Sequence, residues 1–181
     1  MKPKVYIETS IPSYLTAWHN RDIVVAGNQK TTKEWWEKRN NFDLFISTFV
    51  LEEASAGDIE AAKARLAILA DISEIEITEE VEIIAKRLLS HASLPSKAKI
   101  DALHIATATI GGMDYLLTWN CTHIANPAFR AKIESVIRFF DYEPPVIWAR
   151  KEINCTFRRS DLCQIWLIRL NEYAVIVDYF E

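Results

Sequence analysis

Several acidic and amide side chains stand beside short apolar segments that are typical of β-strands. Glu8 directly follows one such segment, and Asn120 follows another. Glu52 and Glu53 lie one turn into the helix expected after a second strand, and Asp101 opens the helix expected before a later strand. Ligands of parallel α/β sheets gather outside the carboxyl ends of the strands. We therefore expect these side chains, from four distant segments, to converge at one edge of a sheet.

A group of carboxylates brought together in this way needs a counter-charge. The carboxylates repel one another, and the group can be buried only if a cation neutralises it or if some members are protonated. Oxygen ligands favour Mg²⁺ or Mn²⁺ over Zn²⁺. A divalent cation of this kind suits phosphodiester hydrolysis, because it activates water and stabilises charge on the phosphate.

Each of these residues also has an ordinary structural interpretation. Asp101 could cap a helix or face its dipole, Glu52 and Glu53 could belong to a solvated helix face, and Asn120 could be a turn residue. Glu8 is harder to explain in this way, since it ends a strand whose residues suit a protein interior. Taken as a set, the residues favour a site.

The first half of the chain predicts the elements that would carry these residues. Residues 4–7 form a short β-prone run, and Pro12 suits the first turn of the helix that follows. Asp22 can cap a helix within residues 21–40. A second strand within residues 42–48 leads into a helix that stops near Gly57.

The second half repeats the alternation. Asp58 caps an Ala- and Leu-rich helix, and Thr78 opens another with a capping-box-like start after the short strand SEIEIT. A helix from residue 99 ends at Gly111 and Gly112, and the buried-looking strand DYLLTW follows at once. A last short strand is expected after the pair Pro144 and Pro145. Strands that alternate with helices predict a three-layer α/β/α sandwich with a central parallel sheet, in which residues 4–7 are the central strand.

Length and composition limit the protein class. The chain has 181 residues, of which 50% are hydrophobic, which is enough for one domain with a sizeable core. We assign residues 1–150 to that domain and leave the apolar extension 151–181 unassigned. No segment approaches the roughly 20 uninterrupted apolar residues that span a bilayer, so we expect a cytoplasmic protein without a membrane partner. The three cysteines lack metal-ligand spacing.

The charge balance argues against a general attraction to nucleic acid. The net charge is -4 and the isoelectric point is about 5.6, so no overall positive field draws the protein onto a polyanion. Any contact with RNA must use a local basic patch, for which Lys97, Lys99 and Arg130 are the candidates.

In its order and spacing of motifs, the chain resembles the PIN domain family, and within it the VapC-like toxins of type II toxin–antitoxin systems. The matching segments are KVYIETSIPSYL, RDIVVAGNQKTTKEWWEKR, ISTFVLEEASAGD, KIDALHIATATIGGMDYLLTWNCTHIANP and YEPPVIW. The resemblance implies a catalytic set of Glu8, Glu53, Asp101 and Asn120, in which the three acids bind Mg²⁺ or Mn²⁺. The supporting hydroxyls are Thr9, Ser10 and Thr118, and Glu52 is the second choice for the position of Glu53.

The function implied by this resemblance is a metal-dependent endoribonuclease, the toxin of a type II toxin–antitoxin pair. RNA is then the substrate, an antitoxin protein covers the acidic cleft, and the apolar extension suggests a homodimer. Two positions depart from the family pattern. Glu8 replaces an aspartate, which moves the carboxylate outward by about 1.5 Å, and Asn120 replaces an acid. The alternative is a catalytically weakened PIN-like module that binds RNA or protein.

Other interpretations find less support in the residues. The four glycines form neither a GxGxxG motif nor a P-loop after the first strand. Cys121 and His123 are close in sequence but lack a third partner or a nucleophile elbow. His104 lies three residues after Asp101 on the same helix face, and we interpret it as a helix residue hydrogen-bonded to backbone. Four tryptophans, Trp35, Trp36, Trp119 and Trp148, are expected in the core.

Overall fold

The computed structural model describes residues 1–92 and 94–149, so the extension 151–181 lies outside the described residues. Its core is one five-stranded sheet in the order β3-β2-β1-β4-β5, and all of its pairings are parallel. The strands are β1 (Lys4–Ile7), β2 (Asp43–Ser47), β3 (Ser73–Ile75), β4 (Tyr115–Leu117) and β5 (Val146–Trp148).

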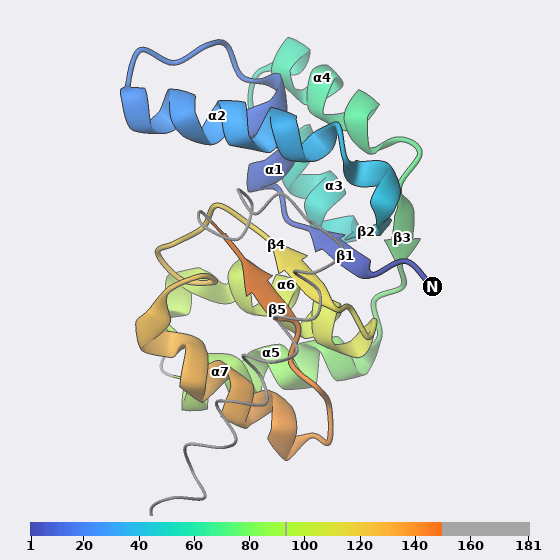
Figure 1. The fold of residues 1–181 in the computed structure, drawn as a ribbon. Coiled ribbons are helices and arrows are strands. Elements are labelled where there is room, and N and C mark those ends of the chain that lie inside the picture. The colour runs from blue at the N-terminus through green and yellow to red at the C-terminus, as the bar shows by residue number, and fades with distance from the viewer. Residues whose placement is uncertain (93, 150–181) are drawn as a thin grey trace, which may run out of the picture.

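Helices cover both faces of this sheet (Figure 1). The helices are α1 (Ser10–Thr16), α2 (Ile23–Trp36), α3 (Thr48–Ser55), α4 (Ile59–Leu69), α5 (Glu79–His91), α6 (Lys99–Ile110) and α7 (Pro127–Phe139). Two short 3-10 turns, η1 (Arg39–Asn41) and η2 (Ser96–Ala98), precede β2 and α6.

The connections explain why the helices form two layers. From β1 to β3 the chain moves one way across the sheet through α1–α4, and from β3 to β5 it moves the other way through α5–α7. Right-handed crossovers in opposite directions place their helices on opposite faces. The three-layer α/β/α architecture and the parallel sheet are confirmed.

The central strand is β1, as the sequence predicted. It pairs with β2 through Val5 opposite Leu44, and with β4 through Ile7 opposite Leu117. The side chains of Val5, Tyr6 and Ile7 are fully buried, as expected for a strand covered on both faces. The direction of the connections reverses between β1 and β4, so a crevice is expected outside the carboxyl ends of these two strands.

Most of the predicted helix boundaries are confirmed. Oδ1 of Asp22 accepts hydrogen bonds from the N–H groups of Val24 and Val25, and Oδ1 of Asp58 accepts one from Ala61. Gly112 follows α6 with a φ of 62°, a left-handed conformation that glycine adopts without strain.

The start of α5 differs from the prediction. Thr78 is its N-cap residue, but its side chain makes no capping hydrogen bond, so the capping-box expectation was wrong. The first turn instead carries Glu79, Glu80 and Glu82. Their negative charges interact favourably with the positive end of the helix dipole, which stabilises the start without a side-chain cap.

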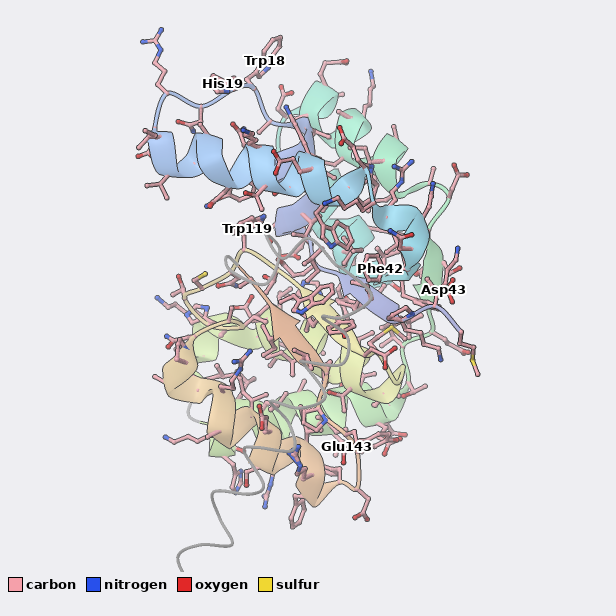
Figure 2. All side chains as sticks on the ribbon, viewed as in Figure 1. Trp18, His19, Phe42, Asp43, Trp119 and Glu143 are labelled. Carbon is pink, nitrogen blue, oxygen red and sulfur yellow. The ribbon has the colours of Figure 1, made fainter. Side chains whose placement is uncertain are left out.

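Three of the four tryptophans expected in the core are buried, and Trp36 is partly buried. Trp35, Trp119 and Trp148 are buried, and Nε1 of Trp119 donates to Oγ1 of Thr32 over 2.8 Å. Trp18, between α1 and α2, is exposed at the surface (Figure 2). Among residues 1–92 and 94–149, no helix combines the length and the apolar character needed to cross a membrane.

Candidate active site

Glu8 ends the central strand inside the protein. Its N–H donates to the carbonyl of Leu117 over 3.1 Å, and the residue is only 6% exposed. Oε2 accepts hydrogen bonds from Oγ of Ser10 and, over 2.7 Å, from Oγ1 of Thr118. No hydrogen bond from the described residues reaches Oε1. Thr118 follows β4, so this contact joins the carboxyl ends of β1 and β4, the two strands between which the direction of the connections reverses.

Glu53 reaches the same place from α3. Its Oε2 accepts a hydrogen bond from Oγ1 of Thr9 over 2.6 Å and contacts Nε2 of His104 at 2.8 Å. The neighbouring Glu52 is exposed, and its side chain makes no hydrogen bond or ion pair within the described part of the chain. The helix therefore turns Glu53, and not Glu52, toward Glu8.

The environment of Glu53 keeps its carboxylate charged. Partial burial, the largest influence, would raise the pKa of Glu53. The hydrogen bonds with His104 and Thr9, together with the charge interaction with His104, outweigh burial and bring the pKa below its ordinary value. The side chain of Glu53 is 40% exposed, so it offers a charged ligand that solvent can reach.

His104 forms part of a buried chain of side chains behind Glu53. The residue is fully buried, and its Nδ1 lies 2.8 Å from the hydroxyl oxygen of Tyr6, which in turn lies 2.7 Å from Oγ of Ser47. Burial, above all, raises the pKa of Tyr6, so its hydroxyl stays neutral. Both ring nitrogens of His104 therefore contact side chains, and the expectation of a backbone partner was wrong.

The sequence contains a signal for this series of hydrogen-bonded side chains. Tyr6 and Glu8 are two residues apart on an extended segment, and such residues lie on the same face of a sheet. His104 lies three residues after Asp101, which places both on one face of α6. The two periodicities together put an aromatic hydroxyl, an imidazole and the acids at one site.

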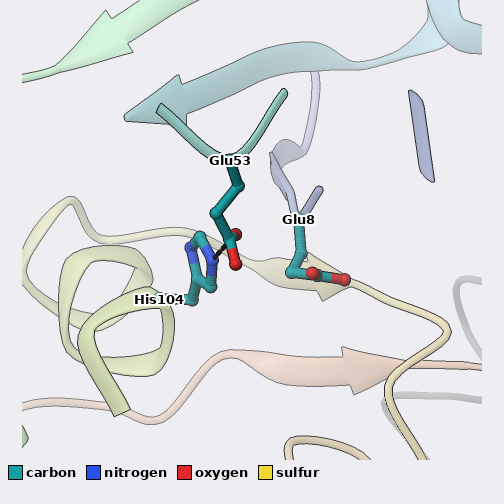
Figure 3. Close-up of side chains that lie close together, drawn as sticks. All are labelled: Glu8, Glu53 and His104. Atoms are coloured by element: carbon teal, nitrogen blue, oxygen red, sulfur yellow. Dashed lines mark hydrogen bonds and ion pairs between the residues drawn. The ribbon is translucent and has the colours of Figure 1, made fainter. Parts of the chain in front are cut away.

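Glu8, Glu53 and His104 form a compact group that could hold a metal ion (Figure 3). Each offers one ligand atom, and these atoms lie within 4.8 Å of one another. Two carboxylates so close together repel each other, and a divalent cation would relieve that repulsion. The chemistry of the donors and their spacing therefore fit a divalent metal.

Asp101 and Asn120 form a second group beside the first. Nδ2 of Asn120 donates to Oδ1 of Asp101 over 2.8 Å, and Nδ1 of His123 lies 2.7 Å from Oδ2 of Asp101. The backbone N–H of Asn120 donates to Oγ1 of Thr118 over 2.8 Å, and Thr118 donates to Glu8. The four residues predicted from the sequence thus lie at one end of the sheet, divided between two connected groups.

His123 was missed as a member of this site. Its proximity to Cys121 in sequence drew attention to a thiol pairing, whereas the structure pairs it with Asp101 and leaves Cys121 exposed. The turn that follows β4 brings this about, because Oδ1 of Asn120 accepts hydrogen bonds from the N–H groups of Thr122 and His123.

The three basic residues expected to contact RNA differ in whether their side chains are free to bind a phosphate. Nη2 of Arg130 donates to the carbonyl of Ile147 over 3.0 Å, which ties this side chain to β5. Lys97 and Lys99 are exposed in η2 and at the start of α6, the helix that carries Asp101.

Two solved structures share this fold. One is VapBC2 from Rickettsia felis bound to a DNA fragment from its promoter, with 16% identity, 82% of this chain and 99% of that chain covered, and a TM-score of 0.51. The other is VapC20 of Mycobacterium tuberculosis, a sarcin–ricin loop cleaving toxin. It is 19% identical to this chain, the match covers 70% of this chain and 93% of that chain, and the TM-score is 0.51. No curated protein shows significant sequence similarity to this chain.

The sequence itself matches the PIN domain family over residues 5–120. This range runs from Val5, the second residue of β1, through β4, and contains all the residues of both side-chain groups except His123. The chain belongs to the PIN domain family.

Proposed function

We propose that this protein is a metal-dependent endoribonuclease and the toxin of a type II toxin–antitoxin pair. The observation that carries the proposal is the convergence of Glu8 and Glu53 at the carboxyl end of the central strand of a PIN domain. That is where a parallel sheet of this topology binds its ligands.

The residues of the two side-chain groups would have different roles in catalysis. Glu8 and Glu53 would hold Mg²⁺ or Mn²⁺ together with Asp101, and Asn120 would be a neutral member that orients Asp101. When bound, the cation supplies a Lewis acid that polarises water and the scissile phosphate. Ser10, Thr118 and Thr9 fix the carboxylates of Glu8 and Glu53 through hydrogen bonds, so the acids are positioned before substrate arrives.

RNA is the proposed substrate. The Mycobacterium tuberculosis neighbour is a toxin that cleaves the sarcin–ricin loop, and single-stranded or looped RNA exposes its backbone to such a site. Lys97 and Lys99 are exposed near Asp101 and could contact phosphates. By analogy with the VapBC2 complex from Rickettsia felis, we propose an antitoxin protein as partner, with the toxin as a homodimer in the cytoplasm.

A second candidate function is a PIN-like module that binds RNA or protein without cleaving it. One observation favours it: both carboxylate oxygens of Asp101 already contact Asn120 and His123. A metal ion would have to compete with those contacts. A binding module needs no divalent cation, so metal dependence separates the two functions.

The test is cleavage of a mixed RNA pool by the purified full-length chain with Mg²⁺, with Mn²⁺ or with excess EDTA. We expect cleavage only with a cation, and none from a folded Asp101→Ala variant. A fully active, metal-responsive Asp101→Ala protein would remove Asp101 from the mechanism. RNA binding without cleavage, unchanged by EDTA, would establish the binding module instead.

A further inference from the structure

We infer that Nε2 of His104 is a direct ligand of the cation, so that Glu8, Glu53 and His104 form a mixed oxygen and nitrogen site that selects Mn²⁺ over Mg²⁺. The inference rests on the proposed function, which requires a cation at this place. It goes beyond the acids-only site that the sequence implied, because it assigns the metal a nitrogen ligand and hence a preference.

The spacing of the three ligand atoms suits a shared ion. Nε2 of His104 lies 2.8 Å from Oε2 of Glu53, and the three ligand atoms of the group lie within 4.8 Å of one another. Metal–ligand bonds of about 2.1 Å place neighbouring ligand atoms about 3 Å apart and opposite ones about 4.2 Å apart. Only small side-chain movements would therefore bring all three atoms onto one ion.

Glu8 adds a carboxylate to the group, and its hydrogen bonds use only one of the two carboxylate oxygens. Both of its side-chain hydrogen bonds end on Oε2, and Oε1 accepts none from the described residues. The residue is 6% exposed. A buried carboxylate is costly unless its charge is offset, and a cation bound beside Glu53 and His104 would offset it.

The buried chain behind His104 supports a metal-bound imidazole. A histidine that binds metal through one nitrogen almost always donates the N–H of its other nitrogen to a fixed partner. Nδ1 of His104 already has such a partner in the Tyr6 hydroxyl, which can accept from Nδ1–H while it donates to Oγ of Ser47. The hydroxyl can equally donate to Nδ1, so the chain accommodates either tautomer, including the one whose Nε2 is free for a metal.

A nitrogen ligand changes which ion the site prefers. Carboxylate, carbonyl and water oxygens suit both Mg²⁺ and Mn²⁺, but Mn²⁺, a transition metal, accepts an imidazole nitrogen more readily than the harder Mg²⁺ does. If His104 only positioned Glu53, the ligands would all be oxygens and this preference would be lost. Metal selectivity and direct detection of the nitrogen therefore test the same point in two ways.

The experiment is pulsed electron paramagnetic resonance on the full-length chain loaded with Mn²⁺, prepared with ordinary and with ¹⁵N-labelled histidine. We expect nitrogen coupling to Mn²⁺ that changes with the label. The test variant is His104→Gln, whose amide can still donate to Glu53 but offers no imidazole nitrogen. The matched control is His123→Gln, which alters the other histidine beside a site carboxylate.

For His104→Gln we expect the coupling to vanish and Mn²⁺ affinity to fall by about 10–100-fold, while Mg²⁺ affinity, measured by competition, is unchanged. The coupling should persist in His123→Gln.

Mn²⁺ bound without nitrogen coupling in the wild-type chain, or coupling retained in His104→Gln, would overturn the inference and leave the proposed nuclease intact. A folded wild-type chain that binds no Mn²⁺ would overturn both. If His104→Gln fails to fold, label-dependent coupling that persists in His123→Gln still supports His104, the histidine that lies beside Glu8 and Glu53, and its absence from the wild-type spectrum overturns the inference.

Discussion

Oγ1 of Thr118 donates a hydrogen bond to Oε2 of Glu8 over 2.7 Å. This bond joins the carboxyl ends of β1 and β4, between which the direction of the chain connections reverses. Thr118 is fully buried and also accepts a hydrogen bond from the N–H of Asn120. One hydroxyl therefore connects the group around Glu8 with the group around Asp101.

Replacing Thr118 by valine should destabilise this junction. Thr118→Val keeps the shape of the side chain but leaves the buried Glu8 carboxylate and the N–H of Asn120 short of a partner, so we expect a loss of about 1–3 kcal/mol in the free energy of unfolding. Urea unfolding with EDTA present measures this loss without metal binding. Thr118→Ser, which keeps the hydroxyl, should recover most of it; equal stability of the valine variant and the wild type would show that the contact contributes nothing.

Removal of the Tyr6 hydroxyl should destabilise the buried chain behind Glu53. Tyr6→Phe leaves Nδ1 of His104 and Oγ of Ser47 without their shared partner in the interior, and the expected cost is again about 1–3 kcal/mol. The comparison is Tyr14→Phe, whose hydroxyl makes no hydrogen bond within the described residues. We expect the urea unfolding midpoint to shift for Tyr6→Phe alone, and an equal shift in the two variants would contradict the role of the Tyr6 hydroxyl.

His123 should act by holding Asp101. His123→Ala removes the contact between Nδ1 and Oδ2 of Asp101, and loss of such a supporting contact at a metal site typically costs 10–100-fold, so we expect about that reduction in RNA cleavage. His123→Asn can place an amide nitrogen where Nδ1 lies, so it should recover much of the rate. If alanine and asparagine were equally impaired, His123 would not act through this hydrogen bond.

The contribution of Glu53 to stability should depend on pH. Its pKa is below the ordinary value in the folded chain, so its carboxylate stabilises the fold above the unfolded pKa of about 4.3. That contribution is lost as the pH falls through the lower, folded pKa. Urea unfolding of metal-free wild type and Glu53→Gln should therefore converge as the pH falls from 5 toward 3. A stability difference that stays constant over this range would contradict the lowered pKa.

The fold could be predicted from the sequence because local signals and global topology agree. The apolar run at Val5, Tyr6 and Ile7 has no polar face, as a strand buried on both sides requires. The caps at Asp22 and Asp58 follow from short-range hydrogen bonds. Thr78 shows the limit of such signals, since a capping residue in the right place need not form the cap when the neighbouring charges already stabilise the helix.

The site could be predicted only in part, because its contacts join residues far apart in sequence. The carboxyl end of β1 located Glu8, but the choice of Glu53 over Glu52 depends on the rotation of α3 relative to Thr9 and His104. The partners of His104 lie on β1 and α3, and no pattern within α6 alone reveals them. His123 was missed for the same reason, since it lies in the turn after β4 and its partner Asp101 is on α6.

RNA cleavage by Glu53→Gln and Glu52→Gln, each compared with the wild type at equal Mn²⁺, tests the central claim most directly. The two variants change adjacent glutamates of α3 by the same chemistry, and only Glu53 belongs to the group with Glu8 and His104. We expect metal-dependent cleavage by the wild type and by Glu52→Gln, and its loss in a folded Glu53→Gln. Equal cleavage by both variants, or cleavage by the wild type that persists in EDTA, would contradict a metal-dependent active site at this end of the sheet.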